Sequence, residues 1–216
     1  MKEKSRYDTS GLIDAQSEPG SGGRVLKNLL GIKRKREMDQ VEGREQRRAL
    51  GELIRVYDRD HRFTAADIRR IHKLWLGNVY AWAGEYRQVN VSKGGFMFAA
   101  AEQIPNLMIE FEHGPLRDYT PCVFEEREQI VHALAVVHVE LVLIHPFREG
   151  NGRLARMLSI LMGLQGGLPL LDFGNIKGKK KQEYFLAVQA GMDRAYAPME
   201  KIFSVVIGRT LRIRGR

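Results

Sequence analysis

The sequence contains a single cysteine, Cys122, and no long run of apolar residues. One cysteine cannot form a disulfide within the chain, which is typical of proteins from a reducing compartment. No stretch reaches the ~18 apolar residues that a membrane-spanning helix needs, so we expect no membrane partner. The first ten residues, MKEKSRYDTS, lack the apolar core of a secretion signal. We therefore expect a cytoplasmic protein, or one that is delivered into another cell.

The overall composition favours one folded domain. Hydrophobic residues make up 44% of the chain and charged residues 28%, which is typical of a soluble globular protein. At 216 residues the chain can fill one core, or one domain with appendages. We find no internal repeat.

The net charge is +9, and basic residues gather at 33–36, at 177–181 and at 209–216. A positive charge of this size attracts nucleic acid, ATP or acidic proteins. A nucleic-acid surface would need aromatic residues interleaved with these clusters, and the sequence has none there. We therefore do not expect nucleic acid as a partner. A non-catalytic basic binding module stays open as an alternative function.

The chain divides into three parts. Residues 17–23, SEPGSGG, are typical of a linker, so residues 1–23 are predicted to form a flexible arm. Residues 24–208 are predicted to form the folded domain, and residues 209–216 a basic C-terminal tail.

Most of the domain has helical periodicity, and the predicted fold class is all-α. Thr64 followed by Asp67 is a capping box that opens one helix. Thr120-Pro121 is typical of a helix start, and the helix from there to Ile144 has apolar residues on several sides, as a central buried helix would. Further helices are predicted at about 37–57, 101–113, 154–164, 180–192 and 198–213.

Residues 89–98 depart from helical periodicity. Val89, Val91, Phe96 and Phe98 alternate with polar residues around Gly94-Gly95. Apolar alternation around a glycine pair predicts a β-hairpin.

The stretch from His145 to Arg156, HPFREGNGRLAR, concentrates the chemistry of the chain. Small residues let successive backbone N–H groups point at one spot, and a helix N-terminus behind them adds its dipole, so residues 150–152 suit a phosphate. Arg153 and Arg156 lie on one helical face as further anion donors. Glu149 beside a phosphate suits Mg²⁺, and His145 can take up a proton near neutral pH.

This stretch resembles the signature of the Fic (Fic/Doc) family, H-x-F-x-D/E-G-N-G-R-x-x-R, at every specified position, and similar patterns extend over about residues 30–205. The resemblance implies a mainly helical Fic-type bundle with a small β-hairpin flap over the active site. The flap would hold a target protein by strand pairing. Its residues here would be Val91, Ser92, Lys93, Gly94, Gly95 and Phe96.

The resemblance also implies an activity, the transfer of AMP from Mg²⁺–ATP to a Ser, Thr or Tyr hydroxyl of a target protein. His145 would act as the general base and Glu149 would hold Mg²⁺. The nucleotide site would be formed by Phe147, Gly150, Asn151, Gly152, Arg153 and Arg156, with Phe147 as its packing anchor.

Other reactions remain open. Family members with Lys at the position of Gly152 are kinases, so Gly152 favours nucleotidyl over phosphoryl transfer. Phosphocholine transfer and removal of AMP are compatible with this motif. Outside the family, His138, Glu140 and His145 allow a metal hydrolase, although they lack the i, i+4 histidine pair of zinc proteases.

Many Fic proteins carry an inhibitory helix, S/T-x-x-x-E-G/N, whose glutamate pairs with the second motif arginine. Glu42-Gly43 fits the end of this pattern, but position 38 is Met. Glu42 is therefore a candidate inhibitory residue, and the alternative is a solvent-facing glutamate on the first helix. An inhibitory glutamate could also come from a separate antitoxin-like protein.

Overall fold

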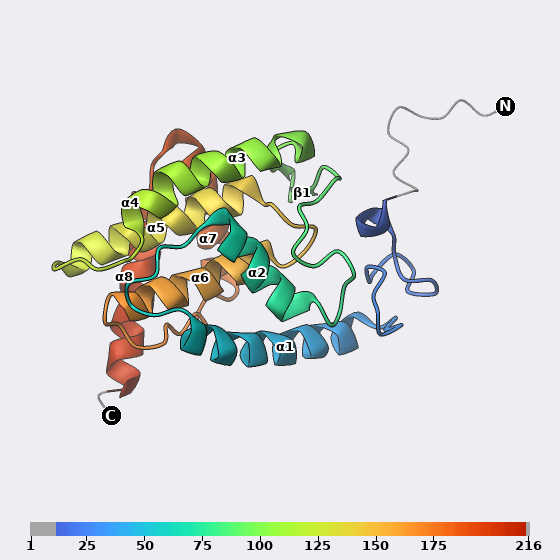
Figure 1. Ribbon diagram of the computed structural model, residues 1–216, viewed down its shortest axis with the longest axis horizontal. Helices are drawn as coiled ribbons and strands as arrows, with labels where there is room; N and C mark the ends of the chain where they lie inside the picture. The colour runs from blue at the N-terminus through green and yellow to red at the C-terminus, as the bar shows by residue number, and fades with distance from the viewer. Residues whose placement is uncertain (1–11, 215–216) are drawn as a thin grey trace.

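The computed structural model describes residues 12–214, and it is mostly helical, as predicted (Figure 1). The longer helices are α1 (Lys35–Val56), α2 (Ala65–Leu76), α3 (Ile104–Phe111), α5 (Arg127–Ile144), α6 (Asn151–Gln165), α7 (Lys179–Ala190) and α8 (Ala197–Arg214). Short turns of helix are η1 (Ile13–Ala15), η2 (Ala101–Gln103), η3 (Glu112–Leu116), α4 (Arg117–Tyr119) and η4 (Gly191–Asp193). Within residues 12–214 no helix is long and apolar enough to cross a membrane.

Helix α5 is the centre of the bundle. It packs against α3, α6, α7 and α8, and in Figure 1 it lies between α3 and α6. Its buried residues point in all directions around the helix, which is why the sequence shows apolar residues on several sides: Ile130, Val131, Ala133, Leu134, Ala135, Val136, Val137, His138, Val139, Leu141, Val142 and Ile144. The prediction of a central buried helix is confirmed.

Helices α1 and α2 form a pair that packs on α6. The N-terminus of α2 has the predicted capping box: the Thr64 hydroxyl accepts from the Asp67 N–H, and the Asp67 carboxylate accepts from the Thr64 N–H. The buried side of α2 includes Ile68, Ile71 and Trp75. This pair brings α1 to the helix that carries the two motif arginines.

The predicted helix start at Thr120-Pro121 is wrong, because α5 begins at Arg127 after an N-cap at Glu126. Thr120 ends the preceding helix instead. Its N–H and its hydroxyl both donate to the Leu116 carbonyl, at 3.0 and 2.6 Å, and the hydroxyl accepts from the Phe63 N–H. The Thr120 hydroxyl is therefore engaged by the preceding helix and by Phe63, and Glu126 provides the N-cap of α5 instead.

The predicted hairpin is present. Strands β1 (Ser92–Lys93) and β2 (Phe96–Met97) are antiparallel, with Ser92 opposite Met97 and Lys93 opposite Phe96. Gly94 and Gly95 form the two-residue turn with φ of +58° and +83°. Positive φ at both positions defines the turn that matches strand twist, and glycine adopts it without steric cost.

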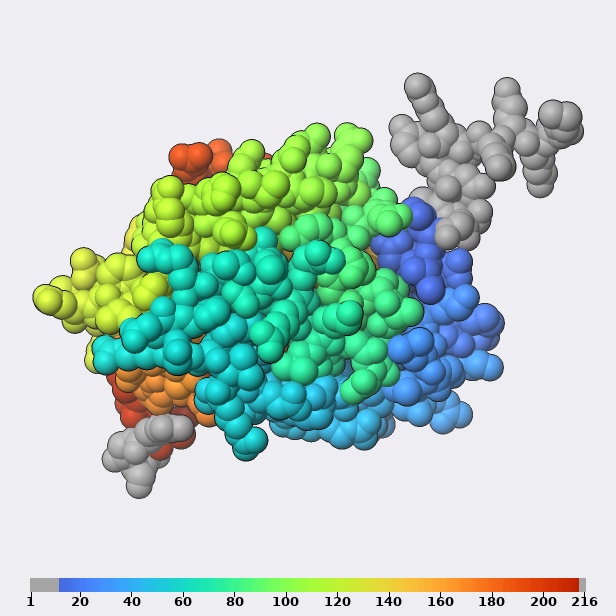
Figure 2. Space-filling view, in the orientation of Figure 1, coloured from blue at the N-terminus to red at the C-terminus, as the bar shows by residue number. Residues whose placement is uncertain are grey.

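Residues 12–23 lie on the domain, although the sequence assigned them to a flexible arm; residues 1–11 of that arm lie outside the described residues. Asp14 is buried, and its carboxylate accepts from the Gln88 N–H at 3.0 Å. The Asp14 carbonyl accepts from Arg148 Nε at 2.8 Å. Figure 2 shows this segment, in dark blue, against the green surface around it. At the other end, α8 takes in residues 209–214 of the predicted tail.

Candidate active site

The motif loop joins the C-terminus of α5 to the N-terminus of α6. His145 follows α5 in the left-handed region, at φ 53° and ψ 57°, which turns the chain sharply. Gly150 is the N-cap of α6 at φ +85°. Asn151 closes the loop: its Oδ1 accepts from the Phe147 N–H at 2.9 Å and its Nδ2 donates to the Phe147 carbonyl at 2.7 Å. The loop is therefore held rigidly by one buried side chain.

Phe147 is fully buried and its ring stacks on His72 of α2, with ring centroids 3.9 Å apart. His72 Nδ1 accepts from the Gly84 N–H at 2.9 Å, so the proton must lie on Nε2, which donates to the Glu149 carbonyl at 3.1 Å. Burial lowers the pKa of His72 to about 4, so the ring is neutral. His72 thus fixes the backbone of the motif loop, a role that sequence reasoning missed. Its position on the apolar stripe of α2 was a signal of burial.

His145 is oriented as a proton acceptor. Its Nδ1 lies 3.1 Å from the Val142 carbonyl oxygen, to which it donates, so the lone pair is on Nε2. No hydrogen bond to Nε2 is present within residues 12–214. Burial lowers the pKa of His145 to about 4, so the imidazole is neutral near pH 7. The Phe98 ring stacks on it at a centroid distance of 3.7 Å.

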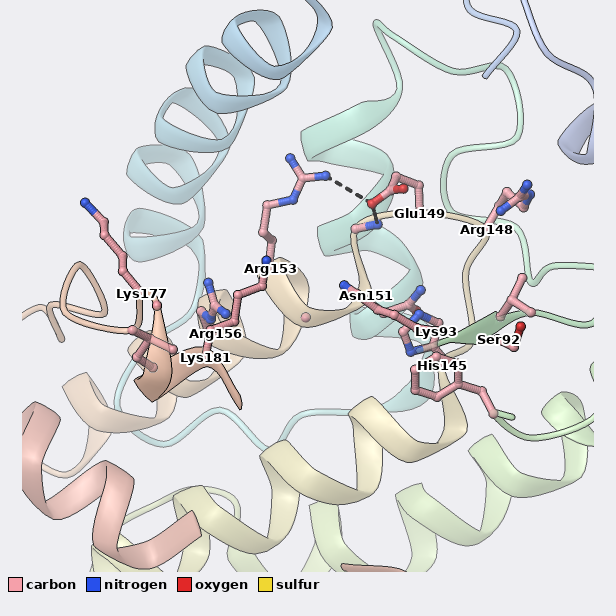
Figure 3. Close-up of a pocket in the computed structure, with 16 residues that line it drawn as sticks. Ser92, Lys93, His145, Arg148, Glu149, Asn151, Arg153, Arg156, Lys177 and Lys181 are labelled. Carbon is pink, nitrogen blue, oxygen red and sulfur yellow. Dashed lines mark hydrogen bonds and ion pairs between the residues drawn. The ribbon is translucent and has the colours of Figure 1, made fainter. Parts of the chain in front are cut away.

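A cavity of about 690 Å³ opens beside His145, lined by residues 150–152 at the N-terminus of α6. Lys177, Lys181 and Arg156 lie towards one end of it, and Ser92, Lys93 and His145 towards the other (Figure 3). Its charged lining consists of six cationic side chains and one carboxylate, Glu149. A helix N-terminus and an excess of cations make this cavity suitable for a polyphosphate.

The two motif arginines have different surroundings. Arg153 Nη1 lies 2.7 Å from Glu42 Oε2 and its Nη2 lies 3.3 Å from Glu149 Oε1 (the latter dashed in Figure 3). Arg156 has no carboxylate partner among the described residues, and its guanidinium lies over the Tyr184 ring, 5.4 Å from the centroid. Its Nε is buried without an acceptor in that part of the chain. Arg156 therefore keeps its charge available to an anion.

Glu149 remains a carboxylate at neutral pH. Burial alone would raise its pKa, but the Gly150 N–H and the charges of Arg153, Lys35 and Lys93 hold the pKa below its usual value. Oε1 accepts from the Gly150 N–H at 2.9 Å, and the side chain lines the cavity. One carboxylate facing an anion site fits Mg²⁺, which prefers carboxylate and phosphate oxygens together.

The flap residues lie at the mouth of this cavity and of a second one. Val91, Ser92 and Lys93 line the charged cavity. Lys93, Gly94 and Phe96 line an adjoining, mainly apolar cavity of about 630 Å³ against α7. His145, Phe98, Gly152, Arg156 and Lys181 border both cavities. Gly95 lies in the turn of the hairpin and lines neither cavity.

Arg87, which sequence reasoning also missed, links the flap to the motif. It is only 2% exposed, and its guanidinium donates to the carbonyls of Val89 and Ala99, one on each side of the flap, and of His145. The backbone N–H of Arg87 donates to the Pro146 carbonyl at 2.9 Å. Arg87 lies two residues before Val89 and four before Val91, on the same face of an extended segment. This spacing was the only signal in the sequence that Arg87 belongs with the flap.

Glu42 does not face solvent, so the alternative of an exposed glutamate is wrong. It is 1% exposed, Oε1 accepts from the Tyr80 hydroxyl at 2.6 Å, and its carbonyl accepts from Trp75 Nε1 at 2.9 Å. Its ion pair is with Arg153, the first motif arginine. Met38, where the inhibitory pattern has Ser or Thr, is buried in the core.

The residues of the alternative metal hydrolase do not converge. His138 contacts the Ser159 and Tyr184 hydroxyls, and Glu140 accepts from the Tyr196 hydroxyl. No group of three or more His, Cys, Asp or Glu side chains that could hold a metal ion occurs within residues 12–214.

The structure is therefore a helical bundle with a small hairpin beside a cation-lined cavity. Residues 62–162 match the model of the Fic/DOC family, and this part of the chain belongs to that family. The chain is 33% identical over 162 residues to protein adenylyltransferase VbhT of Bartonella schoenbuchensis, covering 68% of this chain but only 30% of VbhT.

Two further similarities cover more of the matched protein. The chain is 26% identical over 191 residues to "Probable protein adenylyltransferase Fic" of Escherichia coli K12, covering 85% of this chain and 88% of the relative. Among solved structures it resembles the N-terminal Fic domain of a cell filamentation protein from Bartonella quintana with bound ADP. The TM-score is 0.67 at 26% identity, with 84% of this chain and 89% of that chain covered.

Proposed function

We propose that this protein is an adenylyltransferase that moves AMP from ATP to a Ser, Thr or Tyr hydroxyl of a target protein. The observation that carries the proposal is a neutral His145 with a free Nε2, at the edge of a cation-lined cavity that also contains the Glu149 carboxylate. The relatives named as adenylyltransferases support the same reaction.

The two adjoining cavities suggest how ATP binds. The phosphates would lie in the charged cavity, on the N–H groups of residues 150–152, with Arg156 and Arg153 at the outer phosphates. The adenosine would lie in the apolar cavity between the flap and α7, where Phe96 and Phe185 offer aromatic surface. Because the cavities share His145 and Gly152, this placement puts the α-phosphate next to the base.

In the proposed reaction the target hydroxyl attacks the α-phosphorus of ATP. His145 Nε2 accepts the hydroxyl proton, a bond forms between the target oxygen and the α-phosphorus, and the bond to the β-phosphate breaks. Pyrophosphate leaves and AMP remains on the target. Glu149 would hold Mg²⁺, which neutralises phosphate charge when bound.

The target itself would dock on the flap. Ser92 and Lys93 of β1 are exposed, and within residues 12–214 the hairpin pairs with no third strand, so a target strand could add to its edge. Arg156, free of a carboxylate in the described chain, also leaves a place where a separate antitoxin-like protein could insert an inhibitory glutamate.

The test is incubation of the purified protein and a cell lysate with Mg²⁺ and ATP labelled at the α- or the γ-phosphate. We expect label from the α-position alone, and loss of ~100-fold or more in the His145→Ala variant. Label from the γ-position alone would make the protein a kinase. Equal labelling by His145→Ala and wild type would exclude His145 as the base.

A further inference from the structure

A buried carboxylate joins the first helix to the motif. Glu42, from the second turn of α1, pairs with Arg153 on the first turn of α6, with side chains 2% and 27% exposed. Both carboxylate oxygens of Glu42 are used, Oε1 by the Tyr80 hydroxyl at 2.6 Å and Oε2 by Arg153 at 2.7 Å. The Trp75 indole holds the Glu42 backbone carbonyl. Glu42 is therefore fixed on three sides.

Glu42 is close to the charged cavity but does not enter it. It is absent from the lining of that cavity, whereas its partner Arg153 and the adjacent Glu149 both line it. A carboxylate that excludes a phosphate must occupy the place of that phosphate or neutralise all of its cationic ligands, and within residues 12–214 Glu42 pairs with Arg153 alone. Glu42 does not pair with Arg156, so the outer end of the cavity stays cationic.

Arg153 is placed by three groups. Glu42 holds Nη1, the Trp75 ring lies 4.8 Å below the guanidinium carbon, and Nη2 reaches Glu149 at 3.3 Å. The contact to Glu149 is the longer of the two ion pairs. If Glu42 lost its charge, Arg153 would be attracted to its one remaining carboxylate, Glu149, and would compete with a cation for it.

We propose that Glu42 is a positioning residue of the working site and not an inhibitor. By holding Nη1 of Arg153, it limits the guanidinium to one longer contact with Glu149, from Nη2 to Oε1 at 3.3 Å, and so leaves the carboxylate available to Mg²⁺. This inference rests on the proposed function, because it assigns Glu42 a part in binding Mg²⁺–ATP. The inference also implies that the described chain can bind nucleotide without the removal of any helix.

The experiment compares Glu42→Gln with wild type in calorimetric binding of the ATP analogue AMPPNP over a range of Mg²⁺ concentrations, and in transfer of α-label. Gln keeps the size of the side chain and can still accept from Tyr80, so the fold is retained. We expect the Mg²⁺ concentration for half-maximal binding to rise ~10-fold, as for the loss of an outer partner of a metal ligand, and transfer to fall.

Two controls make the result specific. Glu52→Gln makes the same charge change on an exposed part of α1, where Glu52 pairs with Arg48, and should leave the Mg²⁺ dependence unchanged. Tyr80→Phe removes the other partner of Glu42 without changing any charge and should raise the Mg²⁺ requirement less than Glu42→Gln does. It also provides the test if Glu42→Gln does not fold.

The outcomes are distinct. Tighter AMPPNP binding or faster transfer by Glu42→Gln would make Glu42 an inhibitor and overturn the inference. An unchanged Mg²⁺ dependence with a lower melting temperature would reduce Glu42 to a support of the fold and would also overturn it. The calorimetry measures binding and needs no transfer of AMP, so it tests Glu42 even if wild type is inactive. An inactive wild type would contradict the proposed function and not the role of Glu42.

Discussion

The Phe98 ring covers the imidazole of His145, with ring centroids 3.7 Å apart and planes inclined by 21°. Phe98 directly follows β2, so the flap itself shields the proposed base from water. The Phe98 N–H donates to the Val91 carbonyl at 3.2 Å, which extends the hairpin pairing to this position. The protonation of His145 and the position of the flap are therefore linked.

Replacing Phe98 with Ala should raise the pKa of His145 from about 4 towards its usual value of 6.5, because burial is the main cause of the low pKa. The protonated ring cannot accept a proton, so transfer by Phe98→Ala should fall between pH 7 and pH 5, where wild type stays nearly constant. Titration of the His145 ring by NMR measures the shift directly.

Phe96→Ala is the matched control for this prediction. Phe96 is on the same hairpin and packs against Phe98 at 5.3 Å, but has no ring contact with His145. Its removal should leave the titration of His145 near pH 4. An equal shift in both variants would show that the whole flap, rather than the Phe98 ring, excludes water.

Three histidines whose pKa is lowered by desolvation predict loss of stability in mild acid. Burial lowers the pKa of His72 to about 4, of His138 to about 3 and of His145 to about 4. Below pH 6.5 the unfolded chain binds protons at these positions and the folded chain does not, so stability falls with falling pH until the folded pKa values are reached. Each histidine contributes up to ~1.4 kcal/mol per pH unit.

The measurement is the free energy of unfolding in urea between pH 7 and pH 4. His138→Gln, which removes the histidine with the lowest pKa of the three, should make the pH dependence shallower in this interval. A curve with the same slope as wild type would show that His138 titrates alike in the folded and unfolded states.

Arg87→Lys should loosen the flap without closing the nucleotide cavity. A lysine ammonium cannot span the carbonyls of Val89, Ala99 and His145 as the guanidinium does, since these lie before the flap, after the flap and in the motif. We expect kcat/KM for a protein target to fall ~10–100-fold, mainly through KM and target docking, while AMPPNP affinity changes little.

Arg69→Lys is the control for Arg87. Arg69 contacts the Gly84 carbonyl and the Glu85 carboxylate in the loop before the flap, but neither the flap nor the motif. Its variant should keep target kcat/KM. A fall in melting temperature for Arg87→Lys with unchanged kinetics would limit Arg87 to holding the fold.

The motif and the hairpin were predictable because their signals are local. The twelve motif positions are contiguous, the glycine pair marks the turn between β1 and β2, and Thr64 and Asp67 cap α2 within one turn. Such features depend on neighbours in the sequence, where spacing and residue type define the geometry.

What could not be predicted depends on residues far apart in the sequence. Glu42 lies on a polar helix whose charges suggest solvent, yet Tyr80 and Arg153 come from other parts of the chain to bury it. Arg87 is a single residue in a loop without periodicity, and His72 is one polar residue on the buried side of α2, so their roles follow only from the packed structure. The helix start predicted at Thr120-Pro121 was wrong for a related reason, because the Thr120 hydroxyl donates to the carbonyl of Leu116 in the preceding helix.

Two glycines of the motif should differ sharply in their tolerance of Ala. A Cβ at Gly150 would lie 2.8 Å from Trp75 Cζ3, and φ there is +85°, so neither the ring nor the backbone accommodates it. At Gly152 the nearest atom is the Tyr184 hydroxyl at 3.9 Å, an ordinary contact. Gly150→Ala should therefore cost ~2–4 kcal/mol of stability from clash and strain together, and Gly152→Ala close to none.

Thermal and urea unfolding of the two variants beside wild type measures this difference. Because Trp75 also lies under Arg153, Gly150→Ala should disturb the guanidinium and weaken AMPPNP binding in the protein that still folds. Gly152→Ala then separates stability from function, since any loss of binding in that variant comes from the phosphate cavity alone. Equal stabilities would mean that Trp75 moves aside freely, and would contradict the interpretation that α2 packs rigidly on the motif.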